Sequence, residues 1–299
     1  MTLAATTQNN FMEGRSLREQ LLKQAAEVSK NLKKRGVTPT LCVVLVGDDP
    51  ASEIYVDAKL RAAQKVGIEA ALKHMPATTT QVELNTALET LSNDPQIHGI
   101  LLQLPLPKGL KKREALNKIT PKKDVDGLTT TNMGILVARE RGGLRPCTPL
   151  GILRLLKAYN VPLKGQNAVV IGRSQLVGRP VSELLAQAGA TVTTCQRHTA
   201  DISLYTKHAD IVIVATGVPS LITGDMLKQG ATVVDVGITR LDNGDVVGDC
   251  DASSCKKVAG LLSPVPGGVG PMTVATLMTN TLDACLKQTG QPAHDWALK

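Results

Sequence analysis

A tyrosine and a lysine four positions apart are the first residues in this chain whose types and spacing could do chemistry. Tyr55 and Lys59 lie in residues 51–66, a segment whose pattern predicts a helix, so the two side chains share one helix face. An aromatic ring can stack on a flat ligand, and a desolvated lysine can transfer a proton near neutral pH. The alternative is a tyrosine on a helix surface beside a solvated lysine, and the spacing alone leaves both interpretations open.

Three polar residues further along the chain are also candidates for a binding site. Gln103 lies near the end of the apolar run 97–104, and a glutamine among leucines needs hydrogen-bond partners. It could bond to Lys59 and so help set the protonation of the lysine. Asp124 and Asp126 fall in a loop, where an aspartate could accept two donors from the amide edge of a heterocycle. Ordinary loop capping is the alternative for both aspartates.

A second candidate site is a glycine-containing turn between a predicted strand and a predicted helix, in the sequence VVIGRSQLVGRP (169–180). Gly172 allows a tight turn, and the N-terminus of the following helix favours a phosphate group. The spacing G-x-S-x-x-x-G differs from the dinucleotide pattern G-x-G-x-x-G. A purely structural turn therefore remains the alternative.

Two arginines favour the functional interpretation of this turn. Arg173 lies within the turn, and Arg197 follows the next predicted strand, where a dinucleotide fold meets the adenosine ribose. NAD sites tend to place an acidic residue there. In this chain, the first acidic residue after the predicted strand 190–195 is Asp201. The basic residues favour a 2′-phosphate and hence NADP, whereas a merely exposed Arg197 is the alternative.

A third candidate is the loop SPVPGGVGPMT (263–273), which combines three glycines with three prolines. Side chains cannot fill such a loop, so a ligand could approach its backbone closely. An interdomain linker is the alternative.

The elements that must position these residues alternate between strand and helix, which predicts an α/β fold with parallel sheets. After a break at 145–150 the alternation of strands and helices resumes, in the order typical of a doubly wound nucleotide-binding fold. The predicted strands are 40–46, 97–104, 166–171, 190–195, 210–215, 231–236 and 258–261, and the predicted helices are 16–35, 51–66, 81–93, 113–119, 150–159, 177–188 and 272–288.

Length and composition exclude several classes of protein. A chain of 299 residues predicts two domains, and no apolar run approaches the ~20 residues of a membrane helix. The net charge of +8 invites a nucleic-acid partner, but aromatic residues make up only 2% of the chain and the basic residues form small clusters, so we expect none. A modest positive field would instead attract a small polyanionic substrate or cofactor.

The cysteines and the N-terminus indicate where such a protein would act. The six cysteines are scattered without a C-x-x-C pair, so we expect idle or buried thiols and no metal site. Residues 1–10 have neither the basic start nor the apolar core of a signal peptide. We therefore expect a cytoplasmic location.

Taken together, the three candidate segments resemble the bifunctional methylenetetrahydrofolate dehydrogenase/methenyltetrahydrofolate cyclohydrolase family, FolD. The resemblance extends in order over nearly the whole chain, and PGGVGPMT and the Tyr-x-x-x-Lys segment are its most specific parts. The matching segments are VGDDPASEIYVDAKLRAAQKVGI (46–68), GILLQLPLP (99–107), KKDVDG (122–127), RPCTPLGI (145–152), VVIGRSQLVGRP (169–180), VVDVGI (233–238) and SPVPGGVGPMTVATL (263–277).

The resemblance implies an activity and a role for each matching residue. It implies oxidation of 5,10-methylenetetrahydrofolate by NADP, followed by hydrolysis of the methenyl product to 10-formyltetrahydrofolate. Lys59 would be the catalytic lysine, Tyr55 would stack on the folate, and Gln103 would tune Lys59. The folate site would comprise Tyr55, Lys59, Leu102, Gln103, Leu104, Asp126, Pro266, Gly267, Gly268, Val269 and Gly270. The cofactor site would comprise Gly172, Arg173, Ser174, Arg197 and Ile238.

One segment departs from the family. Many members have His-Ser-Lys or His-Ser-Arg where this chain has Gln196-Arg197-His198. The serine contact with the cofactor phosphate is lost here, and Arg197 could replace it.

The resemblance also implies how the chain is organised. We expect a folate-binding α/β domain over residues 1–149 with the returning helix 281–299, and a Rossmann-type NADP-binding domain over 150–280. The active site would lie between the domains, and the family is homodimeric. Two other functions remain open: an enzyme with the dehydrogenase step alone, and a non-catalytic dinucleotide-binding regulatory protein.

Overall fold

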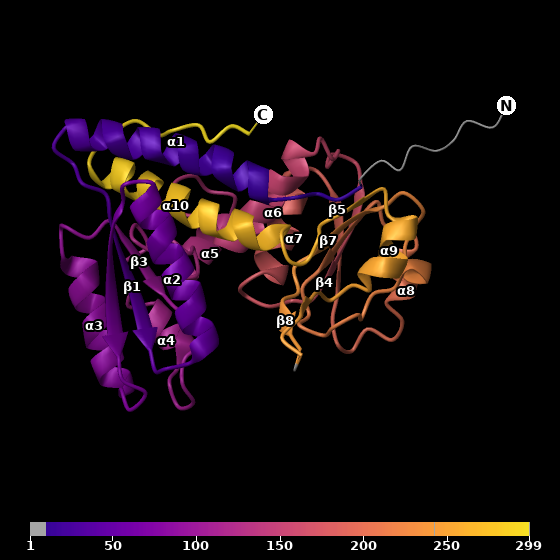
Figure 1. The fold of residues 1–299 in the computed structure, drawn as a ribbon, viewed down its shortest axis with the longest axis horizontal. Helices are drawn as coiled ribbons and strands as arrows, with labels where there is room; N and C mark the ends of the chain where they lie inside the picture. Colours follow the sequence, from indigo (N-terminus) through magenta and orange to yellow (C-terminus); the bar gives the residue numbers. More distant parts are fainter. Residues whose placement is uncertain (1–9, 242, 299) are drawn as a thin grey trace. The chain divides into compact units, whose positions relative to one another are not determined.

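A computed structural model describes residues 10–241 and 243–298 of the chain (Figure 1). The chain divides into two compact units. The three-stranded unit comprises Ser16–Arg154 and Pro271–Lys299, and the five-stranded unit comprises Met1–Arg15 and Leu155–Gly270. The α/β class predicted from the alternating pattern is confirmed, because each unit is built around its own parallel sheet.

The three-stranded unit has the sheet order β2-β1-β3, with all three strands parallel. The central strand β1 (Thr40–Val46) is a continuous apolar run and is almost wholly buried, as expected for a parallel strand covered on both faces. The edge strand β2 (Glu69–Met75) is exposed along nearly its whole length. The strand β3 (Gly99–Leu102) is buried and ends beside Gln103.

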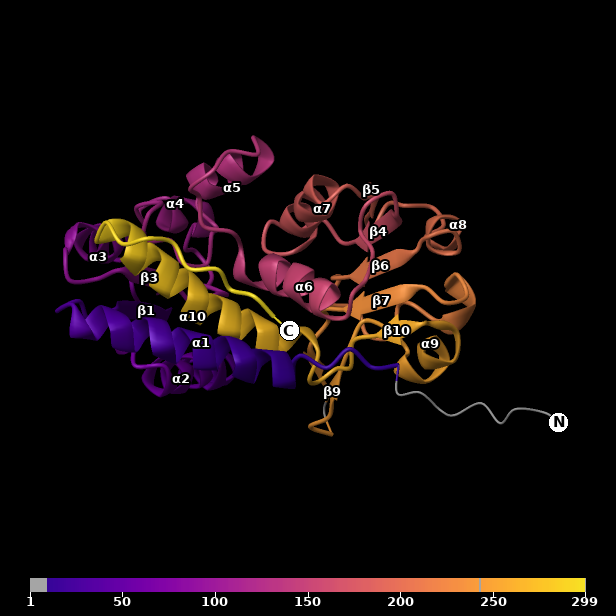
Figure 2. The same cartoon turned by 90° about the horizontal axis from the view of Figure 1, so that it is seen from above.

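Among the described residues, seven helices lie wholly or mostly in this unit. The indigo α1 and the yellow α10 lie side by side although they come from opposite ends of the chain (Figures 1 and 2). Their apolar faces pack into the core, because Leu21 and Leu282 are completely buried. The helices are α1 (Arg15–Lys34), α2 (Pro50–Lys65), α3 (Gln81–Asn93), α4 (Lys112–Leu116), α5 (Thr130–Val137), α6 (Cys147–Ala158) and α10 (Val269–Gln288).

The five-stranded unit has the parallel sheet order β10-β7-β6-β4-β5. Numbered along the chain from β4, this is the order 2-1-3-4-5 of a doubly wound sheet, with its topological switch point between β4 and β6. Ligands of such sheets bind beyond the carboxyl ends of the strands at that point. The strands are β4 (Asn167–Ile171), β5 (Thr191–Cys195), β6 (Ile211–Val214), β7 (Thr232–Asp235) and β10 (Leu261–Leu262).

Shorter elements complete this unit. A two-stranded antiparallel hairpin follows β7. The remaining elements are α7 (Gly178–Gln187), α8 (Ser203–Thr206), the 3₁₀ turn η1 (Gly224–Met226), β8 (Thr239–Arg240), β9 (Val246–Val247) and α9 (Ala252–Val258). Across residues 10–241 and 243–298, each helix is either too short or too polar to span a lipid bilayer.

The structure corrects some predicted elements. The predicted strand 258–261 is wrong at its start, because Val258 ends α9 and β10 begins only at Leu261. The side chain of Asp251 accepts the main-chain N–H of Ser254 at 3.0 Å and so caps this unpredicted helix. The predicted strand 97–104 is shorter in the structure, as β3 covers Gly99–Leu102.

Candidate active site

The predicted partnership of a lysine and a glutamine exists in the three-stranded unit. Lys59 Nζ donates to Gln103 Oε1 at 2.7 Å, which joins α2 to the end of β3. Gln103 Nε2 donates to the carbonyl of Leu104 at 2.7 Å, and this bond turns the amide oxygen toward the lysine. Gln103 is only 6% exposed. The glutamine is therefore a fixed acceptor aimed at Lys59.

The start of α2 explains how Lys59 reaches this position. Asp49 is the N-cap, and its carboxylate accepts the main-chain N–H of Ser52 at 2.9 Å. Pro50 occupies the first helical turn, where its missing N–H costs no hydrogen bond. The helix thus begins directly beyond β1, and Lys59 lies in its third turn.

The surroundings of Lys59 favour its neutral form. Burial lowers the pKa of Lys59 below its usual range, and the negative charge of Asp126 acts in the opposite direction. Burial likewise raises the pKa of Asp126 to about 6, against the influence of Lys59. The two groups are close enough to interact electrostatically, and each is less charged near neutral pH than it would be in water. Such a pair can exchange a proton with a bound molecule.

The two aspartates of the predicted loop have different roles. Asp124 is 1% exposed and accepts the main-chain N–H of Leu128 and of Thr129 and the side-chain amide of Asn132, at 3.1, 2.8 and 2.9 Å. It is a loop cap, as the structural alternative predicted. Asp126 instead lies beside Lys59, so the structure separates the cap from the candidate binding residue.

The other predicted folate contacts of this unit differ in their exposure. Tyr55 is 45% exposed on α2 and presents its ring to solvent. Leu102 is 2% exposed and packs in the apolar core, so its side chain is not available to a ligand in this conformation. Leu104 is half-buried.

In the five-stranded unit, the glycine turn lies at the switch point of the sheet. It joins β4 to α7, and two close approaches require glycine there. A Cβ on Gly172, whose φ is +109°, would lie 2.2 Å from the carbonyl oxygen of Ala215. A Cβ on Gly178 would lie 2.0 Å from the carbonyl oxygen of Gly172. Both glycines are thus required because the turn packs directly against neighbouring backbone, and its place at the switch point of the sheet is where doubly wound folds bind a dinucleotide.

Ser174 has a structural task in this turn as well. Its hydroxyl accepts the main-chain N–H groups of Val177 and Gly178 at 3.1 and 3.4 Å. Arg173 is exposed in the same turn. Arg197 is also exposed, and its Nε donates to Nε2 of His198 at 3.1 Å. Both guanidinium groups are therefore available to an anionic ligand.

Two buried aspartates that the sequence pattern did not single out shape the loops beyond β6 and β7. Asp249 is fully buried and accepts the main-chain N–H groups of Thr216 and Gly217 at 2.6 and 2.9 Å. Asp235 accepts the main-chain N–H of Gly237 at 3.0 Å and that of Asp249 at 2.9 Å. They fix the backbone before Ile238, which is 50% exposed.

The predicted loop Pro266, Gly267, Gly268, Val269 and Gly270 belongs to the five-stranded unit. Its backbone is held within that unit, because Gly268 donates to the carbonyl of Pro264 at 2.8 Å and Gly14 donates to that of Gly267 at 2.9 Å. Its contribution to a folate site stays a prediction.

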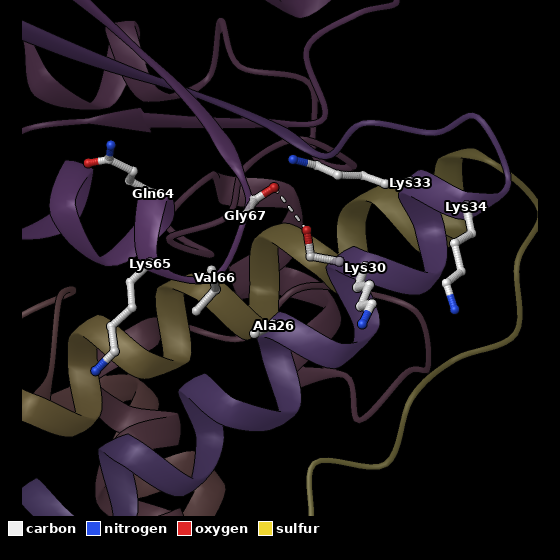
Figure 3. Close-up of a pocket in the computed structure, with 9 residues that line it drawn as sticks. Ala26, Lys30, Lys33, Lys34, Gln64, Lys65, Val66 and Gly67 are labelled. Carbon is white, nitrogen blue, oxygen red and sulfur yellow. Dashed lines mark hydrogen bonds between the residues drawn. The ribbon is translucent and has the colours of Figure 1, made fainter.

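A hollow of about 560 Å³ lies elsewhere, between α1 and α2, and is lined by several lysines (Figure 3). Lys30 and Lys34 point away from Lys33 in this view, so the charges do not converge on one ligand position. Lys33 and Lys34 lie in the last turn of α1, where cations stabilise the helix dipole. Among the described residues, no group of His, Cys, Asp and Glu has the arrangement of a metal site.

Comparison with known proteins identifies the family of both parts of the chain. Residues 12–126 match the model of the tetrahydrofolate dehydrogenase/cyclohydrolase catalytic domain. Residues 146–289 match the model of the tetrahydrofolate dehydrogenase/cyclohydrolase NAD(P)-binding domain. The two matches together cover most of the chain and include Lys59, Gln103 and the glycine turn.

Individual relatives are similar over almost their whole length. The bifunctional protein FolD of Bordetella avium is 47% identical over 274 residues, which are 92% of this chain and 96% of the relative. The crystal structure of FolD from Campylobacter jejuni has a TM-score of 0.91 at 45% identity and covers 93% of this chain and 98% of its own. The Trypanosoma brucei FolD structure is a complex with NADP cofactor and inhibitor. It has a TM-score of 0.90 at 36% identity, and the match covers 94% of this chain and 98% of the T. brucei chain.

Proposed function

Because this chain belongs to the tetrahydrofolate dehydrogenase/cyclohydrolase family, we propose that it catalyses both reactions of the bifunctional enzymes. It oxidises 5,10-methylenetetrahydrofolate to the 5,10-methenyl form with NADP. It then hydrolyses that product to 10-formyltetrahydrofolate. The observation that carries this proposal is the bond from Lys59 Nζ to Gln103 Oε1, which holds a desolvated lysine beside Asp126.

The dehydrogenase step needs alignment more than it needs acid or base groups. When bound, NADP supplies the acceptor for the hydride that leaves the methylene carbon. The turn at Gly172 binds the phosphates, together with Arg173 and Ser174, and Arg197 takes the 2′-phosphate. Ile238 borders the nicotinamide. Tyr55 stacks on the folate and keeps the reacting carbon aligned.

The cyclohydrolase step needs a base. Water adds to the electrophilic methenyl carbon and loses a proton. The hydroxyl proton of the adduct is then transferred to one ring nitrogen as its C–N bond breaks, and the carbon is left as the formyl group. The methenyl group carries a positive charge, so a cationic lysine would oppose its binding. Lys59 in its neutral form accepts the proton from the attacking water. Gln103 accepts a hydrogen bond from Lys59 without adding a negative charge that would keep the lysine protonated.

Asp126 holds the amide edge of the pterin ring, and the remaining predicted contacts complete the folate site. We assign Leu102 and Leu104 to this site through their backbone, since the Leu102 side chain is in the core. We assign Pro266, Gly267, Gly268, Val269 and Gly270 to it through the close approach that a glycine-rich loop allows.

The organisation and location of the enzyme follow from the same proposal. We assign the folate-binding domain to residues 1–149 with 281–299, and the NADP-binding domain to 150–280. These bounds differ from those of the two compact units at residues 1–15, 150–154 and 271–280, and the last of these segments, which includes Asn280, belongs to the three-stranded unit. The assembly is a homodimer, as the family resemblance implies. The location is the cytoplasm, because all six cysteines are buried free thiols, which suits a reducing compartment.

A two-wavelength absorbance assay tests the proposed function. Purified protein is mixed with 5,10-methylenetetrahydrofolate and either NADP or NAD, and reduced cofactor and methenyl product are followed separately. Reduced NADP that forms with little accumulation of methenyl product is the expected result. Equal accumulation of both would establish the dehydrogenase step alone. If neither cofactor supports turnover, and the protein binds NADP but not folate, a regulatory protein is favoured.

A further inference from the structure

A buried asparagine on α10 connects two loops of the candidate folate site. Asn280 is 2% exposed, and its side-chain Nδ2 donates to the main-chain carbonyl of Val125 at 2.8 Å and to that of Arg145 at 2.9 Å. One amide group thus uses both of its N–H donors on two backbone segments. The first segment carries Asp126, and the second leads into α6.

These two segments pack with backbone against backbone. A Cβ on Gly127, whose φ is +68°, would lie 2.6 Å from the carbonyl carbon of Arg145 and from the nitrogen of Pro146. No side chain separates the loop of Asp126 from the start of α6. The position of each segment therefore depends on hydrogen bonds that fix their carbonyl groups, and Asn280 provides one to each.

Cys147 completes the contact at the start of α6. Its main-chain N–H bonds to the carboxyl group of Asp126, and its thiol lies within hydrogen-bonding reach of that carboxyl group. The thiol also lies 3.2 Å from the carbonyl oxygen of Val125 and 3.5 Å from Asn280 Nδ2. The carboxyl group of Asp126 is thus held at the N-terminus of a helix of twelve residues, where the helix dipole favours negative charge.

We propose that Asn280 is a positioning residue for the folate reaction, which acts by holding the Asp126 carboxyl group between α6 and Lys59. The proposal rests on the proposed function, since it assigns Asn280 to the site where the pterin ring binds. Asn280 does not touch the substrate, and its effect is transmitted through the carbonyl groups of Val125 and Arg145. Displacement of these loops would move Asp126 relative to Lys59.

The charged groups around Asp126 determine the pH dependence that this displacement would alter. Lys59 faces it from α2, Cys147 faces it from α6, and Asp124 lies in its own loop. Displacement from the helix N-terminus would remove the main-chain N–H donor that favours the ionised carboxyl group. The acidic limb of the pH profile for folate binding would then move to higher pH.

Two substitutions and one matched control test this role. In Asn280→Ala the amide is absent, and in Asn280→Asp the shape is kept but the two N–H donors are replaced by oxygen. Each variant should raise the KM for 5,10-methylenetetrahydrofolate about tenfold and move the acidic limb upward, with the Kd for NADP unchanged. Thr281→Val is the control, because the Thr281 hydroxyl is buried in the same helix and bonds to the carbonyl of Leu277.

A double-mutant cycle separates positioning from a general loss of packing. In an Asp126→Asn background, Asn280→Ala should change the KM for the folate less than twofold. An equal effect in both backgrounds would overturn the proposal, and so would a folded Asn280→Asp variant with the wild-type KM and pH profile. Failure of the proposed function is distinct, because the wild-type protein would then turn over no folate at all.

Discussion

The side chains of Lys59 and Gln103 form a 2.7 Å hydrogen bond although 44 positions separate them in the chain. The bond places a lysine of lowered pKa against a neutral acceptor, and Asp126 is the negative group that acts on it most strongly. Burial in this setting shifts the lysine toward its neutral form. The cyclohydrolase reaction requires that property of its base, and the following predictions test it.

Replacement of Gln103 by glutamate should suppress the cyclohydrolase step. Gln103→Glu places a carboxylate beside Lys59, which favours the charged lysine and raises its pKa. Because the neutral lysine is the base, the rising limb of the rate profile should move about one unit to higher pH, and the rate at pH 7 should fall about tenfold. The profile of methenyltetrahydrofolate hydrolysis measures this shift. Gln64→Glu adds the same charge on an exposed turn of α2 and should leave the profile unchanged.

The raised pKa of Asp126 predicts that folate binding weakens in acid. The carboxyl group has a pKa of about 6, so below pH 6 it is mostly protonated and is a poorer acceptor for the pterin edge. Binding measured by fluorescence between pH 5 and pH 8 should weaken through this range in the wild type, and Asp126→Asn should bind weakly at every pH. Asp57→Asn, on the exposed surface of α2, is the control. Wild-type affinity that is constant from pH 5 to pH 8 would contradict the assignment.

The carboxyl group of Asp126 should also lower the free energy of unfolding at neutral pH. The folded-state pKa of Asp126 is above its unfolded value, so the folded protein binds the proton more tightly and is favoured below the unfolded pKa. That contribution is lost as the pH rises through about 4 to 6. Asp126→Asn should therefore raise the free energy of unfolding at pH 7 by about 3 kcal/mol and have little effect at pH 4. Urea denaturation at the two pH values measures the difference.

Arg197 should determine the preference for NADP over NAD. Its guanidinium group is exposed after β5, where the ribose of a dinucleotide is expected. Arg197→Ala should raise the KM for NADP about tenfold or more and leave that for NAD unchanged, since only NADP carries the 2′-phosphate. Lys207→Ala removes another exposed cation of the same unit and should not change the ratio of the KM for NADP to the KM for NAD. If that ratio is unchanged in Arg197→Ala, the 2′-phosphate is bound by other residues.

Much of the fold could be predicted because its central strands are buried on both faces. A parallel strand such as β1 is a continuous apolar run that the sequence displays directly. The edge strand β2 was not predicted, since nearly all its residues are exposed and its polar and apolar residues do not alternate regularly. The helix α9 was partly mistaken for a strand, because its short polar sequence has no apolar periodicity and is started by the Asp251 cap.

The residues of the candidate site could be predicted from the sequence, but most of the tertiary contacts between them could not. The residues Tyr55, Lys59 and Gln103 lie on elements with clear patterns, so their places were predicted. The different tasks of Asp124 and Asp126 depend on tertiary contacts that spacing does not encode. Asn280 was not predicted either, because the sequence MTNTLD around it is polar and only the structure shows that this asparagine is buried.

The most direct test of the central claim is the hydrolysis rate of 5,10-methenyltetrahydrofolate by a Lys59→Met variant, corrected for the spontaneous reaction. Loss of the base should slow enzymatic hydrolysis at least about a hundredfold, while NADP reduction, which needs alignment, persists at a measurable rate. Lys65→Met is the matched control, because this exposed lysine of the same helix pairs with Glu19 and should leave both rates unchanged. Hydrolysis by Lys59→Met within about threefold of the wild-type rate would contradict the claim.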